Sequence, residues 1–394
     1  MLNHHVMIKK RLQIYTLNFT YLILHAYLYM LNYKGISMSV SAQQILDQWP
    51  DFFSLVAGKK NNQAALPSSV ENPLANSIIY VSDNKLISQI NSSAVSIAVI
   101  AEKNSQKLDL SELNADITFL STANPKMAMS LVNQHFFAIK DNRLQLGDAD
   151  IHPSATIATS VSIGKNTVIG PNVVIYDDVV IGENCFIGAQ TVIEAHCEIG
   201  DACHVHAMVF IAHHTQMGNH CEVHPQSAVG TEGYGYATDD QGDHHRIPHY
   251  GRVILDDHVH IGASVNIDRG TFDNTHIGRH TKIDNHCHLA HNTIIGEQCF
   301  VTAGFITAGS TTIGNRCSFG GRSSINGHIT ICDGVLVGGA STVRNSIKDA
   351  GAYMGDPLMT MKDGLRAYAT FPHITEMRKT LNSVKKSLEE KEEE

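Results

Sequence analysis

The sequence predicts a mainly β protein built around a parallel β-helix, and three observations support this fold class. An aliphatic residue returns at every sixth position from Ile151 to Val223, and the spacing resumes from Ile277 to Val343 with one polar lapse at Thr307. Glycine often follows the aliphatic residue, as in IGKNTV and IGENCF. A period of six fits neither an α-helix nor a two-sided strand, but it fits a coil of three hexads, or 18 residues.

Glycine and asparagine are expected at the corners of such a coil, where a positive φ angle is needed. A small residue often lies four places after the aliphatic one, in a slot that should face the interior. Seven of the eight cysteines occupy this slot, and only Cys332 does not. We therefore expect them to fill the core rather than to form disulfides or bind zinc. The seven are Cys185, Cys197, Cys203, Cys221, Cys287, Cys299 and Cys317.

Two interruptions break the six-residue spacing. Residues 230–254 are too long for a corner and hold Gly, Tyr, His and Arg, which predicts a loop extruded from the β-helix. Residues 268–276, DRGTFDNTH, predict a smaller bulge of the same kind. Long loops in compact folds are often functional, so both are candidate site segments.

The two flanks of the repeat predict different structures. Residues 39–148 lack the spacing and predict a small α/β domain, with helices near AQQILDQW and PKMAMSLVNQHF and strands at SIIYVS, VSIAVIA and DITFLS. The β-helix domain is placed at 149–347, and a helical extension at 348–394. The extension carries an apolar series spaced by four, three and four, which predicts an amphipathic helix that packs against a partner chain. The series is Met377, Leu381, Val384 and Leu388.

The first 38 residues are interpreted as an apolar extension. Residues 12–33 contain no charged residue and follow a short basic run, which is typical of a membrane-spanning or signal segment. Asn18, His25 and Asn32 weaken that interpretation, and Met38 offers a more natural start before SVSAQQILDQWP. We expect either a start codon placed too far upstream or an unstructured extension, with a real membrane anchor and, less favoured, a cleaved signal as the alternatives.

The composition argues against a nucleic-acid partner, and the many histidines weaken any motif that rests on a single histidine. Charged residues make up only 17% and the formal net charge is −9, which argues against a nucleic-acid-binding protein. With 24 histidines, a single histidine carries little information. The dense group His286, Cys287, His288 and His291 suggests a metal site, but the register directs His286 and His291 to the outside or to corners. Ligands placed so would splay apart within one chain, and we expect no metal there; convergence of ligands from two chains is the alternative.

The coil length supports a sharper inference about His291. Gly309 follows it by 18 residues, so it should stack one strand spacing away, about 4.8 Å. His328 follows His291 by 37 residues, two coils plus one residue. Two imidazoles and a glycine whose backbone N–H is available would suit an acyl-transfer groove. The alternative is three corner residues in a histidine-rich protein.

The combination of IDNHCHLAHN, AGSTTIG, SINGHITICD, NIDRGTFDNT, TEGYGYA and RIPHYGRV with a preceding α/β domain resembles the UDP-3-O-(3-hydroxyacyl)glucosamine N-acyltransferases of lipid A synthesis. The likeness covers about residues 40–390. It implies a left-handed β-helix, a homotrimer with active sites between neighbouring β-helices, and an N-terminal domain that binds the nucleotide. It also implies a UDP-sugar lipid substrate and an acyl chain carried on the phosphopantetheine of acyl carrier protein, with no resident cofactor. The implied location is the cytoplasm, with association with the inner membrane left open.

The resemblance also implies roles for individual residues. The family's general base falls on His291, its second functional histidine on His328 and its oxyanion-type backbone donor on Gly309. Asp284 matches an acidic residue seven before the base, with a supporting role. Amide formation from a thioester needs a proton acceptor of pKa about 6.5 and has a good thiol leaving group, so no metal or covalent enzyme intermediate is required.

Other candidate contacts are less specific. The family's uracil-binding run reads YVSDNKL here, which keeps Tyr80 for stacking but replaces an amide and a second ring with Asp83 and Leu86. A purely structural role for Tyr80 is the alternative. Tyr234, Tyr236 and Arg246 in the long loop are candidates to contact the substrate or the adjacent subunit.

Basic residues near the C-terminus suit the acidic surface of acyl carrier protein, or else form an ordinary solvated helix face. They are Arg366, Arg378, Lys379, Lys385 and Lys386. Two other functions stay open at this stage. One is a different enzyme on the same scaffold, either a UDP-sugar O-acyltransferase or an acetyl-CoA-dependent sugar acetyltransferase. The other is a non-enzymatic trimeric β-helix module.

Overall fold

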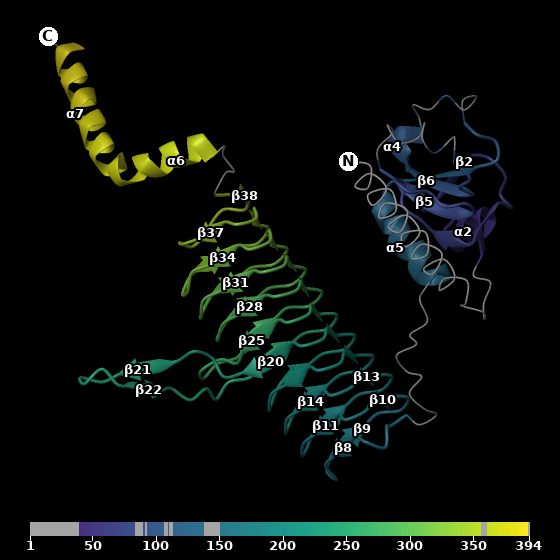
Figure 1. The fold of residues 1–394 in the computed structure, drawn as a ribbon, viewed down its shortest axis with the longest axis horizontal. Coiled ribbons are helices and arrows are strands. Elements are labelled where there is room, and N and C mark those ends of the chain that lie inside the picture. Colours follow the sequence, from purple (N-terminus) through teal and green to yellow (C-terminus); the bar gives the residue numbers. More distant parts are fainter. Residues whose placement is uncertain are drawn as a thin grey trace, which may run out of the picture. The chain divides into compact units, whose positions relative to one another are not determined.

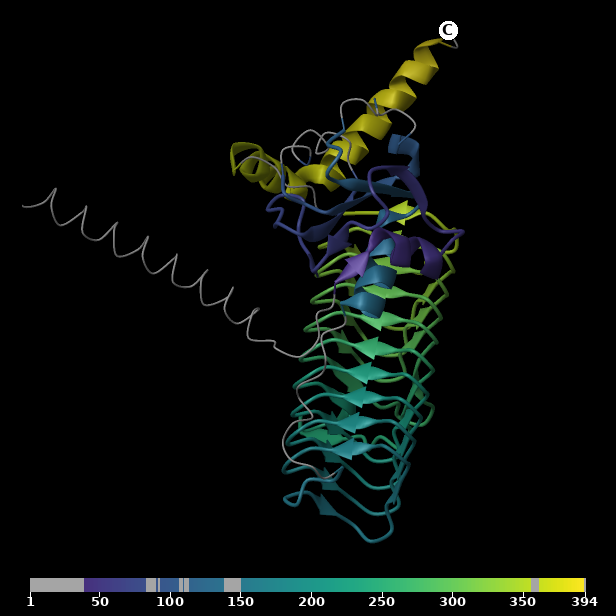
Figure 2. The ribbon, with the colours of Figure 1, turned by 90° about the vertical axis from the view of Figure 1, so that its right-hand side faces the viewer.

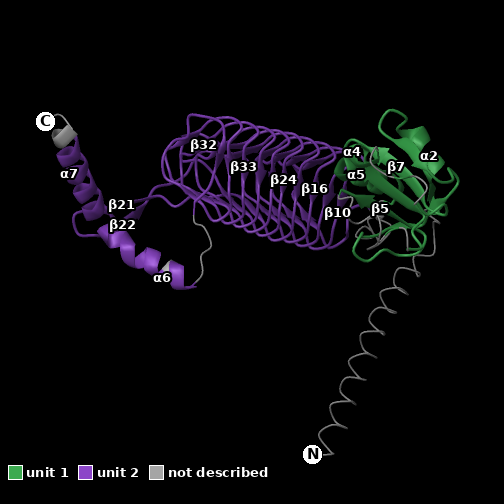
Figure 3. Ribbon diagram, turned by 90° about the horizontal axis from the view of Figure 1, so that it is seen from above, with its two compact units in different colours: residues 1–141 green, residues 142–394 purple. Residues whose placement is uncertain are grey.

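The structure is a computed structural model that describes residues 39–82, 90, 93–105, 109, 113–137, 150–355 and 361–392. The chain divides into two compact units, residues 1–141 and 142–394 (Figure 3). The apolar stretch 12–33, Asp83 and Leu86 lie outside the described residues.

None of the helices in the described part of the chain is both long enough and apolar enough to cross a bilayer.

The first unit is a small α/β domain, as predicted. Its central sheet has the strand order β2-β7-β6-β5-β4, in which β2 runs antiparallel to β7 and the other pairs are parallel. The strands are β2 (Ser54–Ala57), β4 (Leu66–Pro67), β5 (Ser77–Val81), β6 (Ile97–Ala101) and β7 (Thr118–Thr122). A separate antiparallel pair, β1 (Val40–Ser41) and β3 (Gln63–Ala64), and the short helix α4 (Glu102–Ser105) were not expected.

The two predicted helices of this unit begin at side-chain caps. Helix α2 (Ala42–Gln48) follows Ser41, whose hydroxyl accepts from the Gln44 N–H while the Gln44 side chain accepts from the Ser41 N–H. Helix α5 (Pro125–Phe136) follows Asn124, whose side chain accepts from the Met127 N–H. Proline suits the first turn because its missing N–H has no intrahelical partner there. Both helices bury apolar residues in one cluster with strands β5, β6 and β7.

The second unit contains the parallel β-helix that the repeat predicts (Figures 1 and 2). Successive two-residue strands fall in turn on three sheets. We call them sheets I, II and III, in the order in which the chain visits them within one coil from residue 168 onward.

Sheet I consists of β10 (Val168–Ile169), β13 (Phe186–Ile187), β16 (His204–Val205), β19 (Glu222–Val223), β24 (His260–Ile261), β27 (Lys282–Ile283), β30 (Phe300–Val301), β33 (Ser318–Phe319), β36 (Leu336–Val337) and β38 (Ala352–Tyr353). Sheet II consists of β8 (Thr156–Ile157), β11 (Val174–Ile175), β14 (Val192–Ile193), β17 (Phe210–Ile211), β20 (Ala228–Thr231), β25 (Asn266–Asp268), β28 (His288–Leu289), β31 (Ile306–Thr307), β34 (Ser324–Ile325) and β37 (Thr342–Val343). Sheet III consists of β9 (Ser162–Ile163), β12 (Val180–Ile181), β15 (Glu198–Ile199), β18 (Gln216–Met217), β23 (Val253–Leu255), β26 (Thr275–Ile277), β29 (Ile294–Ile295), β32 (Thr312–Ile313) and β35 (Thr330–Ile331).

The register confirms the 18-residue coil. Val168 pairs with Phe186 and Ile169 with Ile187, so each strand lies directly on the strand one coil earlier. The second residue of nearly every strand is buried and the first faces outward, because successive side chains of a strand point to opposite faces. The aliphatic series predicted from the sequence therefore forms the core of the β-helix.

The corners confirm the prediction for asparagine but mostly not for glycine. Most positive φ angles at corners belong to Asn, Gln and His rather than to glycine, as at Asn184 (φ 56°), Gln190 (φ 60°) and His196 (φ 60°). The glycine after the aliphatic residue instead permits close stacking. A Cβ on Gly188 would lie 2.5 Å from the backbone N of Ala207, one coil further on, where no real side chain fits.

The cysteines fill the interior, as predicted. All seven cysteines in the inward slot are buried and free, whereas Cys332 is half-buried. Several donate to a carbonyl of the next coil, for example Cys185 Sγ to the Gly200 oxygen at 3.1 Å. Burial raises the pKa of Cys197 to about 12, which keeps this thiol protonated and unreactive.

Both predicted interruptions leave the β-helix between a sheet II strand and a sheet III strand. The first, between β20 and β23, is more ordered than the loop we expected, because β21 (Tyr236–Thr238) and β22 (His244–Arg246) form an antiparallel hairpin. Figure 1 shows this hairpin projecting from the coils. The second interruption joins β25 to β26 and adds four residues to the coil, since Ile254 pairs with His276, 22 positions later.

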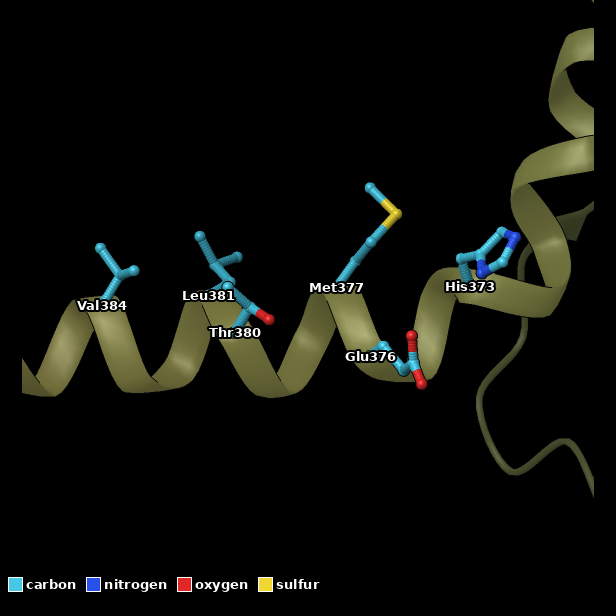
Figure 4. Close-up of a pocket in the computed structure, with 6 residues that line it drawn as sticks. All are labelled: His373, Glu376, Met377, Thr380, Leu381 and Val384. Carbon is cyan, nitrogen blue, oxygen red and sulfur yellow. The ribbon is translucent and has the colours of Figure 1, made fainter.

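The C-terminal extension contains the predicted helix, α7 (Ile374–Glu392), preceded by an unpredicted helix α6 (Met361–Thr370) and the 3₁₀ turn η4 (Phe371–His373). Figure 4 shows Met377, Leu381 and Val384 along one face of α7. These side chains and Leu388 are exposed in the single chain. An exposed apolar stripe on a helix fits the expectation that this helix packs against another chain.

The alternation on one strand gives a matched test of the core. Ile295 on β29 is 1% exposed and its neighbour Ile294 is 42% exposed. Ile295→Ala should lower the free energy of unfolding by about 2–5 kcal/mol, because it removes buried methylenes and leaves a cavity. Ile294→Ala should cost less than about 1 kcal/mol. Denaturant unfolding followed by circular dichroism measures both, and equal losses would contradict this assignment of faces.

Candidate active site

Three residues singled out in the sequence lie along one edge of the β-helix, where sheet II turns into sheet III. His291 lies between β28 and β29, Gly309 between β31 and β32, and His328 between β34 and β35. Backbone hydrogen bonds join the three turns: Ser310 N donates to the His291 oxygen at 2.9 Å, and His328 N donates to the Gly309 oxygen at 3.1 Å. The structure therefore brings His291, Gly309 and His328 together on successive coils of one edge.

The imidazole of His291 lies directly against Gly309. A Cβ built on Gly309 would lie 2.6 Å from both Cε1 and Nε2 of His291, so no larger residue fits beneath this ring. The backbone N–H of Gly309 makes no hydrogen bond to any part of the chain that the structure describes. A free peptide N–H next to an imidazole nitrogen is an arrangement that can bind a developing oxyanion and move a proton.

Asn292 sets the tautomer of His291. The Asn292 Oδ1 atom accepts from the Thr271 N–H at 3.0 Å and lies 3.0 Å from His291 Nδ1. Since a carbonyl oxygen can only accept, Nδ1 of His291 carries the hydrogen and donates it to Asn292. The Nε2 lone pair, next to Gly309, is then available to accept a proton.

A pair of buried threonines supports the turn that carries His291. The Thr293 hydroxyl donates to the Ala290 oxygen at 2.7 Å, and the Ala290 N–H donates to the Thr307 hydroxyl at 3.2 Å. The two hydroxyls also lie 3.0 Å apart. The polar lapse at Thr307 in the aliphatic series is therefore a hydrogen-bonding partner inside the coil, immediately below His291.

The base of the hairpin covers the other side of His291 and brings in a second imidazole. A Cβ on Gly233 would lie 2.8 Å from His291 Cβ and 2.9 Å from Nε2 of His249. The rings of His249 and His291 meet edge to face, with centroids 5.3 Å apart. His249 belongs to the RIPHYGRV motif, but sequence reasoning did not single it out because nothing in the repeat predicts where an inserted loop returns.

His249 is held as a neutral acceptor. Only 5% of the residue is exposed, and its Nδ1 donates to the Ile247 oxygen at 2.9 Å. Its Nε2 is buried and lacks a hydrogen-bond partner within the described residues. Burial lowers the pKa of His249 below its ordinary value. The candidate site thus contains two imidazoles, each with the Nδ1 hydrogen committed and the Nε2 lone pair available.

Two charged residues of the DRG segment anchor the origins of both insertions. Arg269 is 1% exposed, and its Nε donates to the Gly230 oxygen at 2.7 Å while Nη2 donates to the His213 oxygen at 2.8 Å. His213 in turn donates through Nδ1 to Glu194 at 2.9 Å. Asp268 accepts from the Thr231 hydroxyl at 3.1 Å, and burial raises the pKa of this carboxyl. The buried guanidinium therefore fixes the edge on which His291 lies.

The predicted loop contacts lie further out on the hairpin. Tyr234 is 84% exposed and its ring centroid lies 5.2 Å from that of Tyr236. Arg246 forms an ion pair with Glu232. These three residues are placed above the His291 edge on an exposed hairpin, but the structure gives them no contact with His291.

Asp284 is not brought to His291 within one chain. It follows β27, at the edge where sheet I turns into sheet II, and its carboxylate accepts from the Asn285 and Ala303 N–H groups. His286 lies at that same edge, Cys287 points into the core, and the His288 Nε2 lies 3.8 Å from Asp268. The dense histidine and cysteine group is thus spread over two edges and the interior, as the register predicted.

Tyr80 lies in the first unit and is tied to its neighbours there. It is on β5, with its ring against the apolar cluster beneath the sheet. Its hydroxyl donates to Oδ1 of Asn133 on α5 at 2.9 Å, and burial raises its pKa. This arrangement matches the structural interpretation of Tyr80 that the sequence left open beside nucleotide stacking.

Comparisons with known proteins find hexapeptide repeats in two stretches of the β-helix. Residues 160–195 and 178–213 match the family described as bacterial transferase hexapeptide (six repeats), and residues 310–343 match the hexapeptide repeat of succinyl-transferase. The chain is also similar to the UDP-3-O-acylglucosamine N-acyltransferase of Wolinella succinogenes, with 40% identity over 147 residues. This match spans 37% of the chain and 46% of that protein.

Solved structures of similar fold include two acyltransferases. The UDP-N-acetylglucosamine O-acyltransferase of Moraxella catarrhalis is 26% identical, with a TM-score of 0.35, over 56% of this chain and 78% of that one. The UDP-N-acetylglucosamine acyltransferase of Bacteroides fragilis is 21% identical, with a TM-score of 0.40, over 52% and 71%. The sequence match and the repeat families agree with the resemblance drawn from the motifs.

The state of His249 predicts a pH dependence of stability. Because its pKa is lowered in the folded chain from the ordinary 6.5, the folded protein resists a proton that the unfolded chain accepts. The contribution of neutral His249 to the free energy of unfolding is therefore present above the pKa that this histidine has in the unfolded chain. It is lost as the pH falls below that value. His249→Gln should show a smaller drop in melting temperature than the parent between about pH 7.5 and about pH 5.5.

Other histidines with lowered pKa values, such as His214 and His258, stay in both proteins and cancel in this comparison. Scanning calorimetry at the two pH values measures the effect. Identical drops in the two proteins would show that His249 is not held neutral.

Proposed function

We propose that this protein transfers a 3-hydroxyacyl chain from acyl carrier protein to the 2-amino group of a UDP-3-O-acylglucosamine, with His291 as general base. The observation that carries the proposal is the pairing of an Nε2 lone pair on His291 with the free backbone N–H of Gly309 on the adjacent coil. The similarity to the Wolinella succinogenes N-acyltransferase supports the choice of substrate class.

The chemistry needs a proton acceptor and an oxyanion donor at one carbon atom. The neutral sugar amine attacks the thioester carbonyl, which gives a tetrahedral intermediate with an ammonium and an oxyanion. His291 takes the ammonium proton through Nε2, and the Gly309 N–H donates to the oxyanion. Collapse breaks the C–S bond and releases the phosphopantetheine thiol, which takes up one proton. One such backbone donor typically contributes about 3 kcal/mol.

The surrounding groups suit particular parts of the substrates. His328 is exposed one coil beyond Gly309 and can contact a substrate that lies along the edge. The hairpin residues Tyr234, Tyr236 and Arg246 stand where a substrate or an adjacent subunit would pass. Asp284, on another edge, can act only from a neighbouring chain, which fits the resemblance's implication of sites between subunits. Tyr80 would contribute an aromatic face to a nucleotide in the first unit.

Partners follow from the same proposal. The apolar face of α7 would pack in a homotrimer, and its basic residues would meet the acidic surface of acyl carrier protein. They include Arg378, Lys379 and Lys386, with Arg366 on α6 and Lys385 lying 3.8 Å from Glu389. The acyl donor is a substrate, so the reaction needs no resident cofactor. Such a protein would work in the cytoplasm, with peripheral contact to the inner membrane where its lipid product accumulates.

A direct assay tests the proposal. Purified protein is incubated with acyl carrier proteins of several chain lengths and either the 2-amino or the 3-hydroxy form of the UDP-sugar, and products are followed by mass spectrometry. Only the amino sugar should be acylated. Acylation of the hydroxyl alone, or acetyl transfer from acetyl-CoA alone, would instead identify another hexapeptide acyltransferase. Absence of any transfer would favour a non-enzymatic β-helix module.

If His291 is the general base, replacing it by a side chain of similar size that cannot accept a proton should cause a large loss of turnover. His291→Gln should keep the fold and the melting temperature but lower kcat by about 10²–10⁴-fold, because an amide cannot accept the proton. His280→Gln, at the edge where sheet III turns into sheet I, is the matched control and should keep normal turnover. Near-normal turnover in His291→Gln would remove His291 as the base.

The role of Asn292 predicts a shifted pH profile. Asn292→Asp keeps an acceptor for Nδ1 of His291 and a residue that tolerates the positive φ of 60°. A carboxylate next to the imidazole favours its charged form, so the acidic limb of the kcat profile should move to higher pH. An unchanged limb, with normal melting behaviour, would mean that Asn292 does not set the state of His291.

A further inference from the structure

A second group of histidines lies on the outer face of sheet I, away from the edge that carries His291. His204, Glu222 and His260 occupy paired positions on the neighbouring strands β16, β19 and β24. His206 and His224 lie two residues further along the first two of these coils. Four imidazoles and one carboxylate therefore form a compact array on three successive coils.

The side chains of this array converge. The His206 Nε2 lies 2.8 Å from Oε1 of Glu222, and the His224 Nε2 lies 3.3 Å from the same oxygen. The His204 and His206 rings are stacked with centroids 4.5 Å apart, and those of His206 and His224 with centroids 4.4 Å apart. Among the residues that the structure describes, His204, His206 and Glu222 each offer a ligand atom within 4.8 Å of the other two.

The array is partly sheltered but open on one side. His206 is 8% exposed, whereas 30% of the Glu222 side chain and 42% of the His224 side chain remain exposed. The Glu222 carboxylate accepts a hydrogen bond from the His206 Nε2 at 2.8 Å, and a glutamate carboxyl is ordinarily ionised at neutral pH. Two imidazoles and one ionised carboxylate are a donor set that zinc and its neighbours in the first transition series bind well.

We infer that His204, His206 and Glu222 form a binding site for a divalent transition-metal cation of the zinc type. Metal–ligand distances of about 2.0–2.2 Å need the three ligand atoms to close in, chiefly by rotation of the half-buried His204 and Glu222 side chains toward the buried His206. Water or the nearby His224 would supply a fourth ligand. The inference concerns a different sheet from the candidate active site and does not depend on the proposed function.

The charges around the array permit a cation to bind but limit its binding affinity. Besides the three ligands, the titratable groups that face it are His224, His260 and Lys282. The Lys282 ammonium donates to the His258 oxygen at 2.7 Å, so it is held beside the array rather than over it. Protonated imidazoles cannot bind a metal, and binding should therefore be measured above neutral pH.

The test uses the full chain freed of metal with a chelator. Isothermal titration with Zn²⁺ and Co²⁺, together with elemental analysis after gel filtration, should give about one metal ion per chain, and Co²⁺ should show visible d–d absorption that reports nitrogen and oxygen ligands. Mg²⁺ is the control ion and should not bind, because it prefers an all-oxygen octahedral site. Binding should also raise the melting temperature.

Variants separate a built site from a general affinity of a histidine-rich surface. His206→Gln and Glu222→Gln should each weaken Zn²⁺ binding by at least about tenfold. The matched control is the double variant His220→Gln and His258→Gln, which removes two imidazoles stacked at 4.8 Å on an edge of the same coils and should leave the affinity unchanged. Melting curves of the metal-free proteins check that every variant is folded.

Three outcomes would overturn the inference. The first is no stoichiometric binding of Zn²⁺ or Co²⁺ by the parent protein. The second is equal loss of binding in the control double variant, which would point to diffuse affinity for histidines. The third is retention of full affinity in both His206→Gln and Glu222→Gln while their folds are intact.

Discussion

Stacking of each strand on the strand one coil earlier is the constraint from which the rest of the structure follows. The pairing of Val168 with Phe186 and of Ile169 with Ile187 repeats along three sheets, so a residue's place in its hexad fixes its sheet or edge and its direction. Because paired strands lie about 4.8 Å apart, residues one coil apart along the chain become neighbours in space. This geometry brings His291, Gly309 and His328 into one row, and likewise His204, Glu222 and His260.

The candidate active site depends on hydrogen bonds that leave selected atoms without a partner. Asn292 and the Ile247 oxygen each engage one imidazole nitrogen, and the free lone pairs of His291 and His249 lie on the same edge. Thr307 and Thr293 hold the turn from inside, while Arg269 secures the points where the chain leaves the coil. The proposed chemistry at this edge would thus depend on imidazoles and a peptide N–H that are oriented by their neighbours.

The sequence was sufficient for the fold because the spacing of six is a direct consequence of strand pairing. It located the cysteines in the core, the apolar face of α7, and the alignment of His291 with Gly309. It anticipated asparagine at the corners, but not that Gln and His would turn many of them in place of glycine, since the sequence shows only where a corner falls. The glycines instead reflect close backbone approach between coils, which periodicity alone does not distinguish.

What the repeat could not predict lies in the two insertions. His249 reaches His291 only because the insertion folds back on itself at Gly233, which lies against both rings. The six-residue spacing does not predict that path. The array around Glu222 escaped notice for a different reason: its residues are 2 to 56 positions apart in a chain with 24 histidines, and only the register of sheet I unites them.

Both insertions start and finish on strands that stay paired in parallel with the coils on either side, with a register shift between Val229 and Thr231 where the first insertion begins. Length and composition can therefore change at this edge while the coils on either side stay paired. Selection for a new acceptor substrate or a new partner protein could therefore act on the two insertions alone, while the β-helix that carries them keeps its structure.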